Sequence, residues 1–122
     1  MISLVDKFIT VEKTISDEKS SFTLFALFLR EEAEDKWDLV LSANWFEDDK
    51  KKTLDYIVKQ IKNELEPQDM VEISRIILLE PSHPLVQTVN SVIRTEHGKA
   101  EFVDCRFSNI FVKHAFIITS RS

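Results

Sequence analysis

Residues 22–46 have the sequence FTLFALFLREEAEDKWDLVLSANWF, and this stretch decides the fold. It predicts two strands joined by an acidic connection. In the first strand both alternating sets of side chains are apolar, so both faces of that strand must be covered. We therefore expect it in the centre of a sheet. In the second strand the set that contains Asp38 is more polar, and we expect this strand to be covered less completely.

Three other segments carry apolar residues at the helical spacing of three to four. A short strand over residues 8–14 is the alternative for the first of them. The second can be capped by Asp48 or Asp49. The third can be capped by Ser82, and Gly98 can close it. The predicted helices cover residues 2–19, 47–66 and 82–98.

Three more strands complete the chain, and the last two form a hairpin. A turn at residues 108–109 sets Asp104 opposite Lys113. A turn one residue later sets Arg106 opposite Lys113, so that two like charges face each other. Opposite charges across a strand pair stabilise it by ~0.2–1 kcal/mol, and like charges cost about as much. We therefore prefer the first register, with a longer turn as the alternative. The three strands span residues 70–80, 100–108 and 110–120.

The elements follow each other in the order α-β-β-α-β-α-β-β, within a single globular domain over residues 1–122. Strand–helix–strand connections favour parallel pairing, whereas hairpins are antiparallel. The expected fold class is α+β, with a mixed five-stranded sheet and about three packed helices. Because the first strand needs cover on both faces, either the helices are split between the faces or one face is buried in a dimer.

Composition excludes several classes of protein. One glycine is too few for a phosphate-binding loop or a dinucleotide fingerprint, so we expect no cofactor. The net charge is -5, and the dense basic run at residues 50–52 directly follows three acids, so we do not expect nucleic-acid binding. A single cysteine suits a reducing compartment. No apolar run approaches the ~20 residues of a membrane span, and the N-terminus lacks the pattern of a signal peptide. We expect no membrane association and a cytoplasmic location.

Cys105 and His114 suggest a nucleophile–base pair. Their neighbours at alternate positions are apolar, and such surroundings raise the pKa of a thiol instead of activating it. In the preferred hairpin register the two residues do not face each other. A buried cysteine and a structural histidine are the alternative. The histidines show no metal-ligand spacing, so we expect no metal site, and Glu96-His97 is interpreted as a helix end.

Asp38 and Glu31 are weak candidates for a catalytic site. Both belong to the first predicted hairpin, and paired carboxylates on strands hold magnesium in some nucleases. The usual companion, an acid two residues before a lysine on a neighbouring strand, is missing. Glu12 directly precedes Lys13 and falls on the polar side of the first predicted helix.

Trp45, Phe46 and Tyr56 are the candidate partner-binding residues. Successive strand residues point to opposite faces, so we expect Trp45 and Phe46 to enter different layers. Large aromatic side chains at a strand end often contact a partner. The alternative is that both are buried under the following helix, with Tyr56 nearby.

The favoured function is a non-catalytic cytosolic module that acts through protein binding or homodimerisation. Missing glycine loops, missing ligand spacing and a sheet with much apolar surface favour it. One alternative is a small metal-dependent hydrolase or nuclease-like enzyme that uses Asp38, Glu31 or a histidine. Another is a regulatory domain that senses a small apolar ligand between the sheet and a helix.

Overall fold

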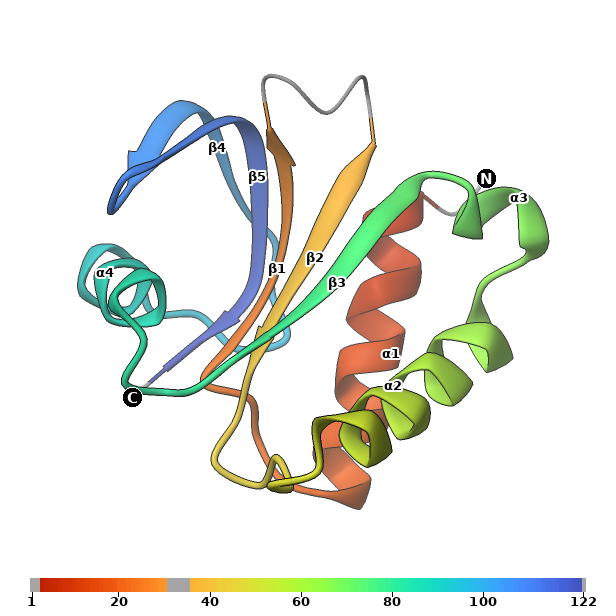
Figure 1. Cartoon of the computed structure of the whole chain (residues 1–122). Helices are drawn as coiled ribbons and strands as arrows, with labels where there is room; N and C mark the ends of the chain where they lie inside the picture. Colours follow the sequence, from red (N-terminus) through yellow and green to blue (C-terminus); the bar gives the residue numbers. More distant parts are fainter. Residues whose placement is uncertain (1–2, 31–35, 122) are drawn as a thin grey trace.

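The computed structural model describes residues 3–30 and 36–121 (Figure 1). The predicted order of elements and the α+β fold class are confirmed, and a four-residue helix, α3, is added before the third strand. The first segment is helical, so the alternative strand at residues 8–14 is wrong. In chain order the elements are α1 (Leu4–Glu18), β1 (Leu24–Arg30), β2 (Trp37–Ser42), α2 (Lys50–Glu64), α3 (Pro67–Met70), β3 (Ile73–Leu79), α4 (Pro84–Val92), β4 (Ala100–Phe107) and β5 (Ile110–Ser120).

The five strands form one mixed sheet in the order β3-β2-β1-β5-β4, with β1 at its centre. β2 and β3 are parallel, whereas β1 pairs antiparallel with β2 and β5, and β4 with β5. Helices α1 and α2 lie on one face, and α4 lies on the other (Figure 1). The helices are therefore split between the faces, which was the first of the two expected ways to cover β1.

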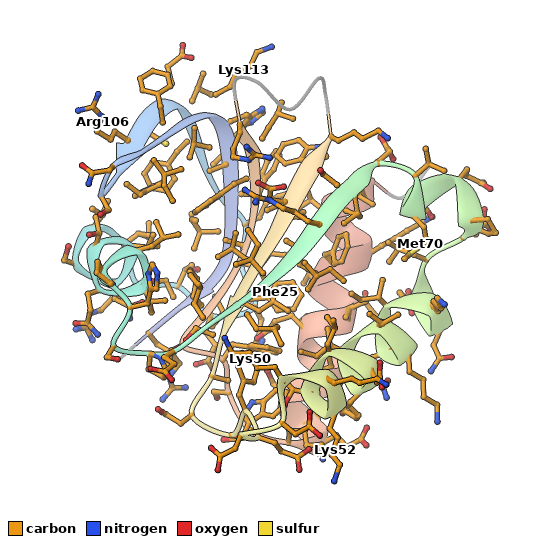
Figure 2. The ribbon with its side chains drawn as sticks, viewed as in Figure 1. Phe25, Lys50, Lys52, Met70, Arg106 and Lys113 are labelled. Atoms are coloured by element: carbon orange, nitrogen blue, oxygen red, sulfur yellow. The ribbon has the colours of Figure 1, made fainter. Side chains whose placement is uncertain are left out.

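Each face of the sheet carries its own hydrophobic core, and β1 contributes to both. Phe25 and Leu27 point into the core shared with α1 and α2, as Figure 2 shows for Phe25. Leu24, Ala26 and Phe28 point into the core shared with α4. Every residue from Leu24 to Phe28 is buried. Burial of a large apolar side chain contributes about 1.5–3 kcal/mol, so the central position of β1 is a major source of stability.

The expectation of a less covered β2 is wrong. Asp38, Val40 and Ser42, which belong to its more polar set, are all buried. The reason is that β3 pairs with the outer side of β2, so β2 is an interior strand. A buried carboxylate needs compensating charge, and Arg75 on β3 supplies part of it.

The helix ends follow local chemistry. Asp49 caps α2, as expected, because its side chain accepts a hydrogen bond from the backbone of Lys51 at 3.0 Å. His83, and not Ser82, caps α4: its Nδ1 accepts from the backbone N–H of Leu85 at 3.1 Å. Gly98 does not close this helix, which ends six residues earlier at Val92. The chain beyond α4 is already extended and bridges to the end of β5.

The β4–β5 hairpin adopts the preferred register. Val103 lies opposite His114, and Cys105 lies opposite Val112, around a turn at residues 108–109. Ser108 has a φ of 59°, the left-handed conformation that a tight hairpin turn requires. Asp104 has a φ of 49°, so the edge strand β4 is kinked in its middle.

Candidate functional site

Cys105 and His114 do not form a nucleophile–base pair in this structure. Cys105 packs against the α4 core, on the opposite side of the sheet from the ring of His114. That ring lies 5.6 Å from Trp37 and 4.7 Å from Phe116, two side chains of the α1–α2 core. Its Nε2 is 2.6 Å from a carboxylate oxygen of Glu101. Burial raises the pKa of the Cys105 thiol, which opposes activation.

Asp38 is a buried carboxylate held by two arginines. Arg30 Nε donates to its Oδ2 at 2.5 Å, and Arg75 Nη2 donates to the same oxygen at 3.2 Å. These two cations supply the positive charge that a bound metal would bring to a catalytic carboxylate. Glu31, the second acid of that hypothesis, lies outside the described residues. Within residues 3–30 and 36–121, no group of three or more histidines, cysteines or acids is placed to hold a metal ion.

Trp45 and Phe46 do not point to opposite faces, because β2 ends at Ser42 and a turn follows. Both rings pack edge-on against Phe22, with centroid distances of 5.5 and 6.3 Å. Tyr56 lies 6.2 Å from Trp45. The three side chains are only partly exposed, and they close one end of the α1–α2 core. This arrangement matches the alternative of burial beneath the second helix.

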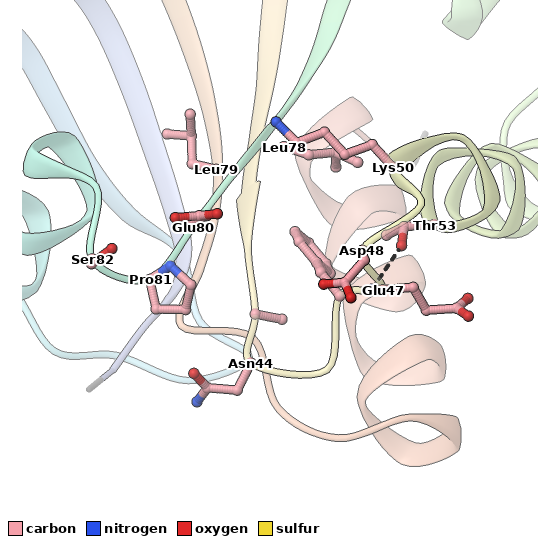
Figure 3. Close-up of a pocket in the computed structure, with 12 residues that line it drawn as sticks. Asn44, Glu47, Asp48, Lys50, Thr53, Leu78, Leu79, Glu80, Pro81 and Ser82 are labelled. Atoms are coloured by element: carbon pink, nitrogen blue, oxygen red, sulfur yellow. Dashed lines mark hydrogen bonds between the residues drawn. The ribbon is translucent and has the colours of Figure 1, made fainter.

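A crevice opens where the parallel strands β2 and β3 end (Figure 3). The loop after β2 leads to α2 on one face, and the loop after β3 leads to α4 on the other. Ligand sites of α/β sheets lie where such loops diverge from neighbouring carboxyl ends. The crevice has a volume of about 440 Å³. Its wall is made of Ala43, Asn44, Phe46, Glu47, Asp48, Lys50, Thr53, Leu78, Leu79, Glu80, Pro81 and Ser82.

The crevice combines an apolar floor with a charged rim. Leu78 and Leu79 belong to β3, and their side chains face the two different cores. Asp48, Lys50 and Glu80 surround the opening (Figure 3). In the part of the chain that the structure describes, no hydrogen bond or ion pair ties these three side chains to one another. Their charges therefore stay available to a ligand.

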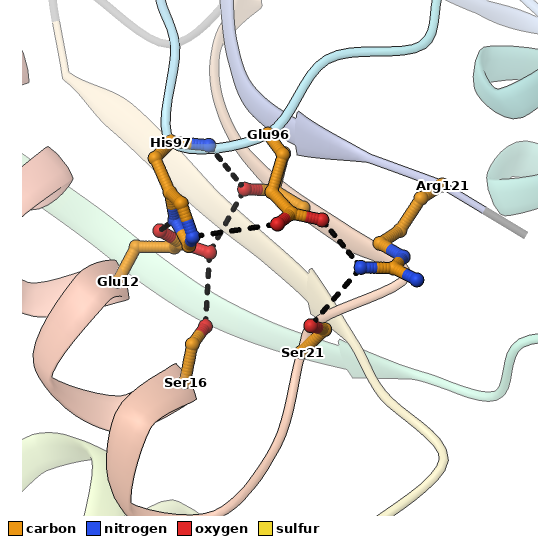
Figure 4. A network of polar contacts seen from close by, with 7 residues as sticks. Glu12, Ser16, Ser21, Glu96, His97 and Arg121 are labelled. Carbon is orange, nitrogen blue, oxygen red and sulfur yellow. Dashed lines mark hydrogen bonds and ion pairs between the residues drawn. The ribbon is translucent and has the colours of Figure 1, made fainter.

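A polar network around Glu12 of α1 was missed by the sequence analysis (Figure 4). Glu12 is fully buried and lies on the packed side of α1, not on its polar side. Its Oε2 accepts hydrogen bonds from Thr119 at 2.8 Å and from Ser16 at 3.0 Å, and its Oε1 contacts Nδ1 of His97. The signal was present in the sequence: Glu12 follows Phe8 by four residues, within the apolar stripe of the helix.

His97 is held from both sides of its ring. Its Nε2 is 3.5 Å from a carboxylate oxygen of Glu96, which also contacts Arg121. The backbone of His97 has a φ of 53°, in the left-handed region that few residues other than glycine adopt. Both ring nitrogens face carboxylates, so the network fixes the orientation of the ring. The network therefore serves as a tie between α1, the end of β5 and the connection that follows α4. Glu96 and His97 lie in this connection and not at the end of α4, so their interpretation as a helix end is wrong.

The outer edge of β3 is the more apolar of the two edges of the sheet. Ile73 and the four residues 76–79 are partly exposed, and they alternate between the two faces. Val71, just before the strand, is 65% exposed. Across the described ranges, no strand pairs with this side of β3. Its unpaired backbone groups are a template for another strand.

No family model, curated protein or solved structure matches this chain. Among the helices of residues 3–30 and 36–121, none is long and apolar enough to cross a membrane.

Proposed function

We propose that the chain is a non-catalytic, cytosolic protein-binding module that works as a homodimer joined through β3. The single observation that carries this proposal is the bare, apolar edge of β3. An unpaired strand edge with isoleucine and leucine on both faces is a hazard for a monomer, and a second copy removes it. The cytosolic part of the proposal is supported by the single cysteine, which suits a reducing compartment.

The other edge of the sheet is protected, which is why β3 and not β4 is the expected contact. β4 carries Glu101, Asp104 and Arg106, and its backbone is kinked at Asp104. Charges and kinks are the usual devices that prevent edge strands from pairing. β3 carries a single charged residue, Arg75, and its pairing with β2 is regular from Arg75 to the end of the strand.

Twofold symmetry restricts how two β3 strands can pair. An antiparallel pair about such an axis places one residue opposite its own copy. If Arg75 occupied this position, two like charges would face each other, which is unfavourable. With Ile77 on the axis, Ile76 faces Leu78 of the second copy, and Arg75 faces Leu79. This register uses the whole regular part of the strand and joins the two sheets into one.

Sedimentation velocity tests the proposal with a matched pair of variants. Ile77→Lys puts two ammonium groups on the symmetry axis, and the long lysine stem lets the charge reach water in the monomer. Val103→Lys makes a similar change on the protected edge, where Val103 is 63% exposed. We expect the wild type and Val103→Lys to sediment as dimers at high concentration, and Ile77→Lys to stay a folded monomer by circular dichroism.

Two results would refute this proposal. One is a wild type that stays at the 14.2 kDa of the single chain at every concentration. The other is an Ile77→Lys variant that dimerises as strongly as the wild type. A dimer that only Val103→Lys disrupts would move the contact to β4.

The crevice favours a second function, a regulatory domain that binds a small apolar ligand. A concave site with an apolar floor and a few polar groups is the usual form of such sites. A thermal-shift screen with small apolar compounds tests it, since a ligand of the folded state raises stability by RT ln(1 + [L]/Kd). Ser82→Trp should block the crevice and abolish the shift, whereas Ser91→Trp on the exposed side of α4 should leave it intact. A screen without any shift, or a shift that Ser82→Trp does not reduce, would reject this function.

A further inference from the structure

A second pocket lies where α1 and β2 begin, beside the hairpin of β4 and β5. It has a volume of about 410 Å³, which is large enough for a small molecule. Its wall includes residues 3–5 at the start of α1, together with Trp37, Glu72, Lys99, Glu101 and Phe116. None of residues 75–79, which are proposed for self-association, belongs to this wall, so the pocket is separate from the β3 contact.

Two aromatic rings form the apolar side of the pocket. Trp37 and Phe116 are half-buried, with ring centroids 5.6 Å apart and ring planes inclined by 42°. His114 lies against both rings, at centroid distances of 5.6 and 4.7 Å. The face of an aromatic ring carries partial negative charge, so rings that line a pocket attract a cation in addition to offering apolar contact.

The charged side chains of the wall also favour a cation. Glu72 is exposed, and within residues 3–30 and 36–121 no hydrogen bond or ion pair engages its carboxylate. Glu101 contacts Nε2 of His114 at 2.6 Å. Lys99 is the one cation of the described wall, and its ammonium group lies 3.3 Å from a carboxylate oxygen of Asp6, which offsets its charge. The wall therefore keeps a surplus of negative charge beside the rings.

The start of α1 does not reverse this preference. A helix N-terminus attracts anions, but the Ser3 side chain already accepts a hydrogen bond from the backbone N–H of Asp6 at 3.2 Å. The carboxylate of Asp6 adds negative charge in the first turn. The chain itself therefore compensates the positive end of the helix.

We propose that this pocket binds a small organic cation, an ammonium or methylated ammonium group carried on a short aliphatic body. The positive head would lie against the rings of Trp37 and Phe116, and the carboxylates of Glu72 and Glu101 would balance its charge. A quaternary ammonium group fits such a wall well, because it has no N–H to donate and ring faces can contact its methyl groups. This inference does not depend on self-association through β3.

Choline and 3,3-dimethylbutan-1-ol test the pocket as a matched pair of probes. The two molecules have the same shape, because a carbon atom in the alcohol replaces the quaternary nitrogen, and they differ in charge. The readout is the indole signal of Trp37 in a two-dimensional ¹⁵N–¹H spectrum. The chain has two tryptophans, so Trp37→Phe identifies this signal, and Trp45, which does not line the pocket, is the internal control.

We expect choline to shift the Trp37 signal saturably and to leave the Trp45 signal in place. The neutral alcohol should bind at least about fivefold more weakly, because it lacks the attraction to the rings and carboxylates. Ethanolamine has a primary ammonium group in place of the methylated one. A saturable shift with ethanolamine alone assigns the site to primary amines, and a shift with choline alone assigns it to methylated ammonium groups.

Three variants separate charge and ring contact from fold. Glu72→Gln keeps the shape of an exposed side chain and removes its charge, so the dissociation constant for choline should rise roughly two- to fivefold with an unchanged thermal midpoint. Glu80→Gln makes the same change on the rim of the crevice and should leave the dissociation constant unchanged. Phe116→Leu keeps apolar bulk but removes a ring face, so it should weaken choline by about twofold or more and the alcohol by less.

Three results would overturn the proposal. One is the absence of a saturable Trp37 shift with either cation. Another is an alcohol that binds as tightly as choline, which would make the pocket merely apolar. The third is an equal effect of Glu72→Gln and Glu80→Gln, because charge would then act only through the whole molecule. Ile77→Lys should bind choline as well as the wild type does, so failure of the dimer leaves this site intact.

Discussion

Replacing Glu12 by alanine should be among the most destabilising single changes in this chain. The carboxylate is fully buried, and two hydroxyl groups and an imidazole converge on it. Its removal leaves the hydroxyl of Thr119, which is also fully buried, without its acceptor. A buried polar group left without its partner costs about 1–3 kcal/mol, and Thr119, Ser16 and His97 all lose theirs, so the total should be about 3–5 kcal/mol. That is a large part of the roughly 5–15 kcal/mol that holds a typical domain folded.

Urea unfolding followed by tryptophan fluorescence measures this cost. With a slope of about 2 kcal/mol per molar urea, a loss of this size lowers the midpoint by roughly 2 M. Glu12→Gln keeps one carbonyl oxygen as acceptor, so it should cost less, about 1–2 kcal/mol. Asp17→Ala, at an exposed position of the same helix, should stay within about 0.5 kcal/mol of the wild type. If Glu12→Ala lost less than about 1 kcal/mol, the tie between α1 and β5 would not exist as described.

Three further predictions test burial and both cores. Burial, and then the negative charge of Glu18, raise the pKa of Tyr56, the only tyrosine, so its absorbance titration should have a midpoint above 10.0. Because the folded state holds the proton longer than the unfolded state does, the free energy of unfolding should fall as pH rises beyond the pKa of the unfolded state. Burial raises the pKa of Cys105, so iodoacetamide near pH 8 should react more slowly with the folded chain than with the chain in urea, and equal rates would contradict this. Phe25→Ala and Phe28→Ala should each lower the free energy of unfolding by about 3–5 kcal/mol, because they empty opposite cores; a loss below about 1 kcal/mol for either would show that its face is not a core.

The central strand and the hairpin register could be predicted because their causes are local. Apolar side chains on both sets of β1 require cover on both faces, whatever provides that cover. The charge of Lys113 decided between two registers only a few residues apart. The burial of Asp38 was not predictable in this way, since β3, which makes β2 an interior strand and brings Arg75, one of its two compensating cations, lies 37 residues later.

The parts of the site that sequence reasoning missed depend on contacts between distant segments. Glu12 and His97 are 85 residues apart, and no local pattern indicates that they meet. The pocket beside Trp37 is similar, because its wall joins the start of α1 to residues of β4 and β5, near the other end of the chain. Trp45 was singled out for its size and position, but the length of β2, which ends at Ser42, decided where its ring points.

Amide hydrogen exchange of β3 at two protein concentrations tests self-association most directly. If a second copy adds to this edge, the amides of residues 75–79 that face away from β2 will exchange more slowly in the concentrated sample. The amides of β4 will exchange at the same rate in both samples. If the mass doubles while β3 exchanges equally fast at both concentrations, the two copies meet elsewhere and the proposed contact is wrong.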